Sequence, residues 1–118
     1  MLLTAMAGVG LCALPASGRA EEVRVIDVVA SRFKFEPATI VVAEGDTLRL
    51  RLRSADRTHG IEIKGLHVKQ SIPSGGDVVT VEFVAERRGT FEITCSEYCG
   101  TGHSAMKGTL LVGARGSH

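Results

Sequence analysis

A strict alternation of apolar and charged residues over positions 47–54 limits the fold of this chain more than any other feature. The stretch reads TLRLRLRS, with three leucines and three arginines at alternate positions. Successive side chains of a β-strand point to opposite faces, so the leucines would lie on one face and the arginines on the other. We therefore expect a half-buried strand whose arginine face is solvated and serves solubility rather than binding.

Other short apolar stretches follow the same pattern along most of the chain. Glycine-, proline- and charge-rich turns separate them, and no window outside the N-terminal segment shows the 3.6-residue apolar period of a helix. Regularly spaced short strands predict a single all-β domain, an antiparallel Greek-key β-sandwich or barrel. The further strands expected are 23–30, 38–43, 60–64, 77–85, 90–94 and 108–113.

The N-terminal segment has the composition of a secretory signal. Residues 1–16 carry no charged side chain. The apolar stretch is about fifteen residues long, shorter than the roughly 20 residues that a membrane-spanning helix needs. Small residues at Gly18 and Ala20 suit cleavage before Glu21. The start of the segment lacks Lys and Arg, so an uncleaved anchor is the alternative. We expect residues 1–20 to be a signal peptide or short N-terminal anchor and residues 21–118 to form the domain.

Charge and cysteine usage narrow the partners and the compartment. The formal net charge is +1, and cleavage after residue 20 would remove one arginine and no acid. A near-neutral surface argues against nucleic acid as a partner, because nucleic-acid binding requires a basic patch. In an exported chain, Cys95 and Cys99 would lie in an oxidising compartment.

Residues 95–106, CSEYCGTGHSAM, concentrate the soft metal ligands of the chain. They hold two of the three cysteines, one of the four histidines and one of the three methionines. The spacing of four between Cys95, Cys99 and His103 would put them on one helix face, but the two glycines between the last two disfavour a helix. We expect a loop between two strands, tight enough at its glycines for the three side chains to point inward.

Thiolate, imidazole and thioether together are a ligand set that suits copper. A mononuclear blue-copper site uses a single cysteine, and this loop has two. The second thiol could form a disulfide with the first, complete a zinc site or bridge a second metal ion. Zinc chemistry has no role for Met106, whereas the compartment and the short loop permit a disulfide. Bridging accounts for the methionine as well as for both sulfurs.

The loop resembles the dinuclear copper (CuA) loop of cytochrome c oxidase subunit II and nitrous-oxide reductase, C-x-x-x-C-x-x-x-H-x-x-M. The likeness extends upstream through FEPATIVVAEGDTLRLRL and DRTHGIEI and covers roughly residues 33–113. It implies a cupredoxin-like fold with two copper ions as cofactor. Subunit II carries two transmembrane helices before its copper domain, and this sequence has at most one short apolar segment. It therefore resembles a short form that lacks the two helices.

The resemblance also implies a role for each of six residues. Cys95 and Cys99 would bridge the metals as thiolates, and His59 and His103 would be imidazole ligands. Met106 would be the weak axial thioether, and Glu97 would contribute its main-chain carbonyl rather than its carboxylate.

Four residues, of which only His59 belongs to this set, need separate interpretation. His59 matters because the loop offers only one imidazole; His67 could compete for the role, but its GLHVK context does not match and favours a surface or packing role. Asp56, three residues before His59, is a candidate partner that orients the imidazole. Tyr98 is expected to pack beside the site rather than to react.

The implied function is electron transfer. Two coppers that share two thiolates spread one electron over both metals, and six ligands leave no open position for a substrate, so we expect no catalytic residues. The resemblance implies a periplasmic relay of single electrons, with a redox donor such as cytochrome c and with haem–copper oxidase subunit I as acceptor. The protein would then be an electron-entry subunit, either exported or anchored to the membrane through its N-terminus.

Two other functions use the same residues. A copper-binding or copper-delivery module would need the same ligands without relaying electrons. A structural β-sandwich with a Cys95–Cys99 disulfide and no metal is the third reading.

Overall fold

The computed structural model describes residues 23–98 and 100–115. The described residues contain nine strands and two short 3-10 helices. In order, they are β1 (Val23–Ser31), β2 (Lys34–Glu36), β3 (Thr39–Ala43), β4 (Thr47–Ser54), β5 (His59–Ile63), η2 (Lys64–Leu66), β6 (Val68–Ile72), β7 (Val79–Val84), β8 (Gly89–Thr94), η3 (His103–Ala105) and β9 (Lys107–Gly113).

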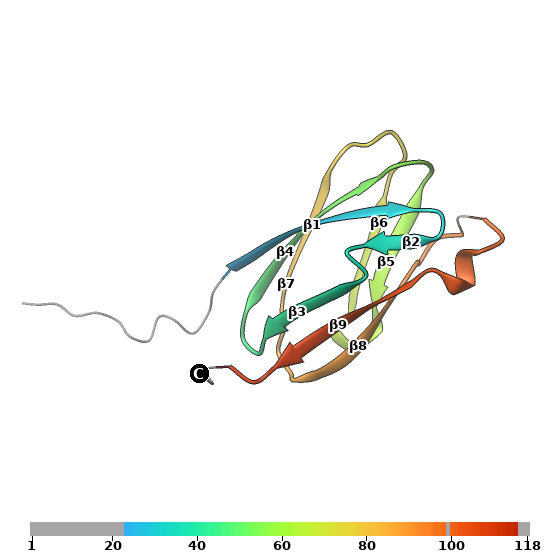
Figure 1. The fold of residues 1–118 in the computed structure, drawn as a ribbon. Helices are drawn as coiled ribbons and strands as arrows, with labels where there is room; N and C mark the ends of the chain where they lie inside the picture. The colour runs from blue at the N-terminus through green and yellow to red at the C-terminus, as the bar shows by residue number, and fades with distance from the viewer. Residues whose placement is uncertain (1–22, 99, 116–118) are drawn as a thin grey trace, which may run out of the picture.

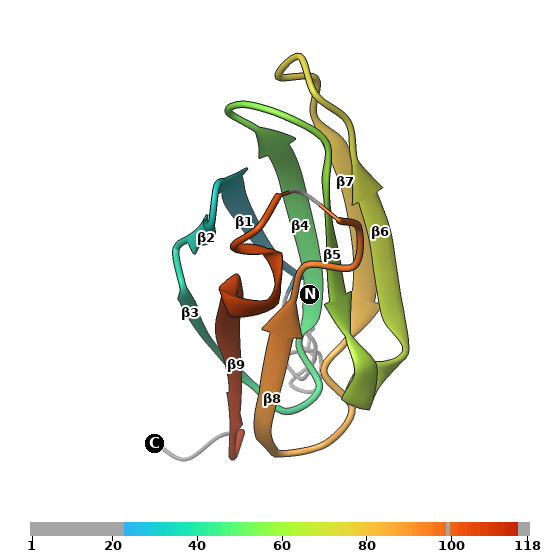
Figure 2. The same cartoon turned by 90° about the vertical axis from the view of Figure 1, so that its right-hand side faces the viewer.

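The strands form two sheets that face each other (Figures 1 and 2). One sheet has the order β2-β1-β4-β7 and the other the order β3-β9-β8-β5-β6. The prediction of a single all-β sandwich domain is confirmed. Two strands were missed by the sequence analysis: β2 has only three residues, and β6 reads VKQSI, which is mostly polar.

The expectation of antiparallel pairing throughout is wrong at two places. β1 pairs parallel with β4, and β3 pairs parallel with β9. The reason is the path of the chain: β2 turns back antiparallel to β1, β3 carries the chain into the other sheet, and β4 then returns beside β1 in its original direction.

The alternating stretch forms β4 over the predicted residues 47–54, and its leucines form the centre of the core. Leu48, Leu50 and Leu52 are all fully buried, and burying each contributes about 1.5–3 kcal/mol. The arginines on the opposite face are partly exposed to solvent, and Arg49 and Arg51 also form ion pairs. Arg49 pairs with a β7 carboxylate and Arg51 with a β1 carboxylate, at 2.6 and 2.5 Å.

A buried carboxylate ties together one end of the sandwich. Asp46, in the turn between β3 and β4, is fully buried. It accepts hydrogen bonds from Nε of Arg24 at 3.1 Å, from the amide of Ala43 at 3.0 Å and from the guanidinium of Arg115. Since an unpaired buried charge is costly, the two arginines make this carboxylate tolerable and connect β1 and the end of β9 to it.

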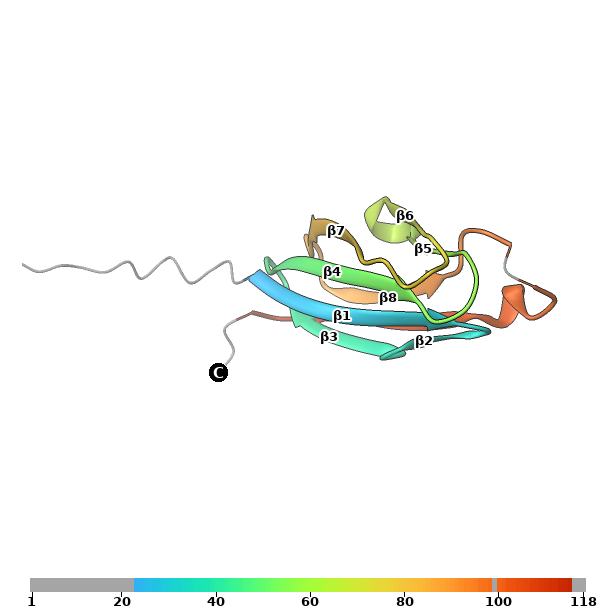
Figure 3. The same ribbon diagram turned by 90° about the horizontal axis from the view of Figure 1, so that it is seen from above.

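The loop between β8 and β9 lies at the other end of the sandwich, where β1 ends and β5 begins (Figure 3). Three segments meet there. They are the β1–β2 turn, the β4–β5 connection and the loop 95–106, which we call the ligand loop.

Candidate metal centre

Strand pairing brings the first and last residues of the ligand loop together. Thr94, at the end of β8, pairs with Lys107, at the start of β9. Cys95 and Met106 therefore stand at the base of the loop, directly next to this pair. Both are buried: Met106 is fully buried, and Cys95 is 6% exposed. The Sγ of Cys95 donates a hydrogen bond to the main-chain carbonyl of Glu97 at 3.1 Å, so this carbonyl and this sulfur lie side by side.

Pairing between β5 and β8 places His59 beside the same loop. The amide of Ser96 donates to the carbonyl of Gly60 at 3.3 Å, one residue from His59. The approach is so close that a Cβ on Gly60 would overlap Ser96 Oγ and lie 3.0 Å from Cγ of Glu97. Only glycine has no Cβ, which makes this contact possible. His59 is thus next to the ligand loop, and its role as a ligand stays a prediction.

The imidazole of His59 is fully buried and has two unlike sides. Its Nε2 lies 2.6 Å from Oδ1 of Asp56, whereas within residues 23–98 and 100–115 its Nδ1 has no hydrogen-bond partner. A carboxylate on one ring nitrogen holds the proton there and leaves the other nitrogen as a lone-pair donor. Since a buried polar atom without a partner costs about 1–3 kcal/mol, the open Nδ1 fits a metal ligand. The expected contact of Asp56 with His59 is confirmed.

Asp56 is held as an anion by its surroundings. Its partial burial would raise the pKa of the carboxyl, but the hydrogen bond with His59 and those from the amides of Arg32 and Arg57 outweigh burial. Together they hold the pKa of Asp56 well below its usual range. The carboxylate therefore accepts the Nε2 proton of His59 throughout the neutral and mildly acidic range.

His103 begins η3 near the exposed tip of the loop. Its ring lies 5.7 Å from the ring of Tyr98, centroid to centroid, with the two planes tilted by 45°. Tyr98 is 72% exposed. The expectation that Tyr98 packs beside the predicted site agrees with this contact.

Phe33, in the β1–β2 turn, is a residue that the sequence analysis did not connect with the site. A Cβ on Gly102 would lie 2.5 Å from Cδ2 of Phe33, and one on Gly100 would lie 3.0 Å from its Cε1. Gly100 also has a φ of +135°, which favours glycine. The loop glycines thus leave room for an aromatic ring. The only signal in the sequence was their presence, which does not name the partner.

Two other candidate residues are not among the described residues around His59 and Cys95. His67 is exposed and follows η2 at the far end of β5 from His59, which agrees with the expected surface role. Cys99 lies outside the described residues. Among the residues that are described, no three His, Cys, Asp or Glu side chains come close enough together to hold a metal ion. The bridging role of Cys99 therefore stays a prediction.

The donor types gathered at this end fit copper. They are an imidazole nitrogen, a cysteine sulfur, a main-chain carbonyl and a thioether, contributed by His59, Cys95, Glu97 and Met106. Soft sulfur with imidazole is the combination that copper prefers. Burial of three of these four side chains would also shield such a centre from water.

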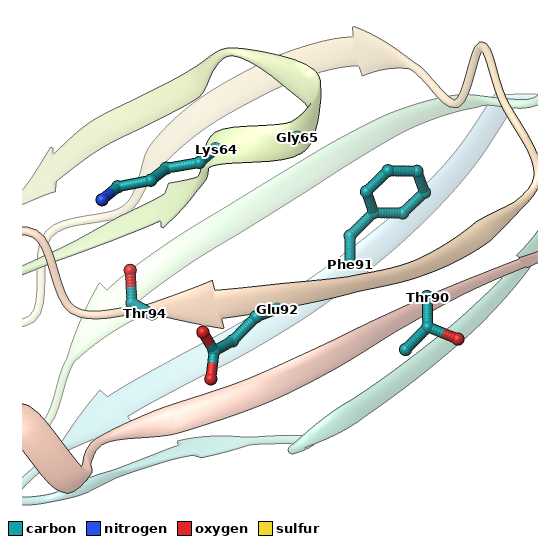
Figure 4. A pocket seen from close by; sticks show the side chains of 6 residues that line it. All are labelled: Lys64, Gly65, Thr90, Phe91, Glu92 and Thr94. Carbon is teal, nitrogen blue, oxygen red and sulfur yellow. The ribbon is translucent and has the colours of Figure 1, made fainter.

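A cavity elsewhere on the domain has a different character (Figure 4). It has a volume of about 260 Å³ and lies between η2 and β8. None of its lining residues belongs to the predicted ligand set; they are Lys64, Gly65, Thr90, Phe91, Glu92 and Thr94. Thr90 and Glu92 also line a second cavity, over β3 and β9.

The two-sheet sandwich and its buried imidazole and sulfur donors agree with the family to which the sequence is similar. The cupredoxin-like domain family matches residues 2–112, so the chain belongs to that family. Membership implies copper binding. Within the family, the chain is related to subunit 2 of cytochrome c oxidase, as the resemblance of its loop indicates.

Two relatives illustrate the relationship. Cytochrome c oxidase subunit 2 of Thermus thermophilus is 34% identical over 85 residues, which is 72% of this chain and 62% of that protein. The subunit 2 of Cereibacter sphaeroides is 35% identical over 95 residues, 77% of this chain and 31% of that protein. The chain thus spans less than two thirds of the length of these relatives.

Solved structures show the same fold. The periplasmic domain of subunit II of cytochrome oxidase (CoxB) of Bradyrhizobium japonicum superposes with a TM-score of 0.70 and 19% identity, covering 78% of this chain and 85% of that chain. Auracyanin A, a blue copper protein of Chloroflexus aurantiacus, gives 0.61 and 16%, covering 76% and 98%.

Residues 1–20, predicted to be a signal peptide or short anchor, lie outside the described part. Within that part, no helix is long and apolar enough to cross a membrane.

Proposed function

We propose that this chain is a periplasmic electron-transfer protein whose dinuclear copper (CuA) centre relays single electrons. The observation that carries the proposal is the buried His59, whose Nδ1 has no hydrogen-bond partner in the described chain and which lies beside a loop of soft ligands. An imidazole from β5 supplies the one ligand that the loop itself lacks. The family membership and the spacing of the loop residues support the same assignment.

Each residue of the proposed ligand set has a defined task. Cys95 and Cys99 would bridge the metals as thiolates, and the remaining ligands would be His59, His103, the thioether of Met106 and the main-chain carbonyl of Glu97. When bound, the copper pair supplies reversible one-electron redox chemistry. The chain itself holds the ligands at the base of the loop and excludes water there. Asp56 keeps the proton of His59 on Nε2.

Burial favours electron relay over copper delivery. A delivery module must expose its ligands to an acceptor, because metal passes between proteins by ligand exchange. Here His59 and Met106 are fully buried, and Cys95 is 6% exposed. An electron needs no such access, since it crosses a protein layer without moving the ligands.

The partners follow from the same assignment. The relatives are named as subunits of cytochrome c oxidase, which supports a redox donor such as cytochrome c and haem–copper oxidase subunit I as acceptor. The periplasmic location is supported by the fold shared with the CoxB periplasmic domain. We infer that the N-terminal segment, as a signal or an anchor, brings the domain there.

The relay is tested by cycling the copper-loaded protein electrochemically and measuring its copper content before and after. We expect reversible one-electron cycling at constant copper. Ready transfer of copper to an apo-acceptor protein, with no reversible wave, would assign the chain to copper delivery instead. A mass lower by two hydrogens in protein that binds no copper would assign it to the disulfide-bonded structural sandwich.

A further inference from the structure

We propose that Asp56 is a positioning residue that joins the two parts of the ligand set, His59 on β5 and the ligand loop. The inference rests on the proposed function, because it concerns how these ligands are held. It goes beyond orienting one imidazole: each oxygen of the carboxylate holds a different part of the site.

The first oxygen holds His59. Oδ1 of Asp56 lies 2.6 Å from Nε2 of His59, and it also accepts the amide of Arg57 at 2.6 Å. The carboxylate therefore determines which ring nitrogen carries the proton and fixes the direction in which Nδ1 points.

The second oxygen holds the β1–β2 turn. Oδ2 of Asp56 accepts the amide of Arg32 at 2.9 Å, and Nε of Arg32 lies 3.6 Å from the same oxygen. Arg32 and Phe33 are the two residues of the turn between Ser31 and Lys34, which pair with each other. With only two residues in the turn, holding Arg32 also restricts Phe33.

Phe33 in turn supports the ligand loop. Its ring fills the space next to Gly100 and Gly102, where a Cβ would come within 3.0 and 2.5 Å of the ring carbons. These glycines lie three residues and one residue before His103. The path from the carboxylate therefore runs through Arg32 and Phe33 to the loop segment that carries the second imidazole.

Asp56 can serve as a fixed point because its own backbone is held. Its amide donates to Oγ of Ser54 at 3.1 Å, and Ser54 is 98% buried at the end of β4. The Ser54 hydroxyl donates to the carbonyl of Arg57, and the amide of Ala55 donates to Ala30 on β1 at 2.9 Å. The carboxylate is thus anchored to both β1 and β4.

The test uses Asp56→Asn, because an amide cannot replace both oxygens. If its oxygen faces His59, its NH2 group meets the Arg32 amide, and if it is flipped, the NH2 group meets Nε2 of His59. At least one contact is lost in either orientation. The matched control is Asp27→Asn, which removes a carboxylate in the exposed pair with Arg51 on the outer face of the β1–β4 sheet.

The first readout is made on copper-free protein by NMR. In Asp56→Asn we expect shifts at His59 or at Arg32, according to which way the amide faces. In Asp56→Ala, which removes both oxygens, we expect shifted ring-nitrogen signals of His59, faster amide exchange at Arg32 and shifted amide signals of Gly100 and Gly102, with none of these in Asp27→Asn or Asp27→Ala. Changes confined to His59 in Asp56→Ala would overturn the proposal, because the carboxylate would then hold one ligand only. This readout needs no metal, so it succeeds or fails independently of the number of coppers bound.

The second readout is copper affinity in a double-mutant cycle. Asp56→Asn should weaken copper binding about 10- to 100-fold, as loss of a ligand's hydrogen-bond partner usually does. Phe33→Leu should weaken it less, and the double variant should lose less than the sum of the two free-energy effects, because both act along one path. Additive effects would contradict the link.

If Asp56→Asn does not fold, Gly102→Ala replaces it. The new Cβ displaces the Phe33 ring, and we expect shifted His59 ring signals in the copper-free protein. Unchanged His59 signals would overturn the proposal.

Discussion

The amide of Ser96 donates a hydrogen bond to the carbonyl of Gly60, with 3.3 Å between nitrogen and oxygen. This bond joins β8 to β5 at the point where the ligand loop begins. It places His59, from the first half of the domain, next to Cys95 and Glu97 from the second half. The proposed ligand set therefore depends on the pairing of two strands that are far apart in the sequence.

Replacing Gly60 by alanine should disturb this pairing. The new Cβ would overlap Ser96 Oγ and lie 3.3 Å from the amide nitrogen of Glu97. Overpacking of this kind costs about 1–3 kcal/mol. That exceeds the stabilisation of about 0.4–1 kcal/mol that a Gly→Ala substitution brings by lowering the conformational entropy of the unfolded chain. We expect lower stability in urea unfolding and weaker copper binding by the folded protein.

Two further variants identify the cause. At Gly113 a Cβ would lie 4.0 Å from the nearest atom, the carbonyl oxygen of Val42, so Gly113→Ala should leave stability and copper binding near those of the wild type. Adding Ser96→Ala to Gly60→Ala should restore part of the loss, because it removes the overlapped hydroxyl. If Gly60→Ala behaves like Gly113→Ala, the close approach of β5 to the loop is not needed.

His59→Ala should change the metal centre while the sandwich stays folded. The variant removes one proposed imidazole ligand, so the visible and paramagnetic resonance spectra of the copper-loaded protein should change. The control is His67→Asn, because His67 has a φ of +59° that asparagine tolerates, and it is exposed at the other end of β5. A wild-type spectrum in His59→Ala, or an altered one in His67→Asn, would reassign the imidazole ligand.

Asp46→Ala should destabilise the fold without altering the centre. It removes the acceptor of the Ala43 amide and of the partly exposed guanidinium groups of Arg24 and Arg115. The guanidinium groups can turn to water, so we expect a loss of about 1–3 kcal/mol from the unpaired donors. Asp27→Ala breaks an exposed pair and should cost at most about 1 kcal/mol. Urea unfolding of copper-free protein measures both values. Equal losses in the two variants would show that Asp46 is no more important than a surface carboxylate.

Copper affinity should fall as the pH is lowered from about 8 to about 5, because protons compete with the metal for thiolate and imidazole. Asp56 should not contribute to this fall. Its pKa lies well below its usual range, so it stays ionised throughout that window. Competition with a chelator at several pH values measures the effect. A constant affinity would argue against thiolate and imidazole ligands.

The sequence predicted the parts of the fold that local pattern controls. The alternation over 47–54 has the bounds of β4 as observed, and the spacing of soft ligands predicted a loop between β8 and β9. The contact of Asp56 with His59 was predictable because the residues are three positions apart. Phe33 was not, because its contact with Gly100 and Gly102 depends on which turn the sandwich brings over the loop. The parallel pairs were missed for the same reason, since β1 and β4, like β3 and β9, pair within a sheet but are not neighbours in the sequence.

A dinuclear centre requires two coppers per chain, and a copper count combined with the paramagnetic resonance spectrum tests this requirement. Copper-free protein loaded with excess copper and then desalted should hold two coppers per chain. It should show a mixed-valence signal with hyperfine splitting from two equivalent nuclei, and Cys95→Ser should lose both properties. One copper per chain with a blue-site spectrum would exclude a dinuclear centre, and two coppers retained in Cys95→Ser would exclude the bridging role of Cys95.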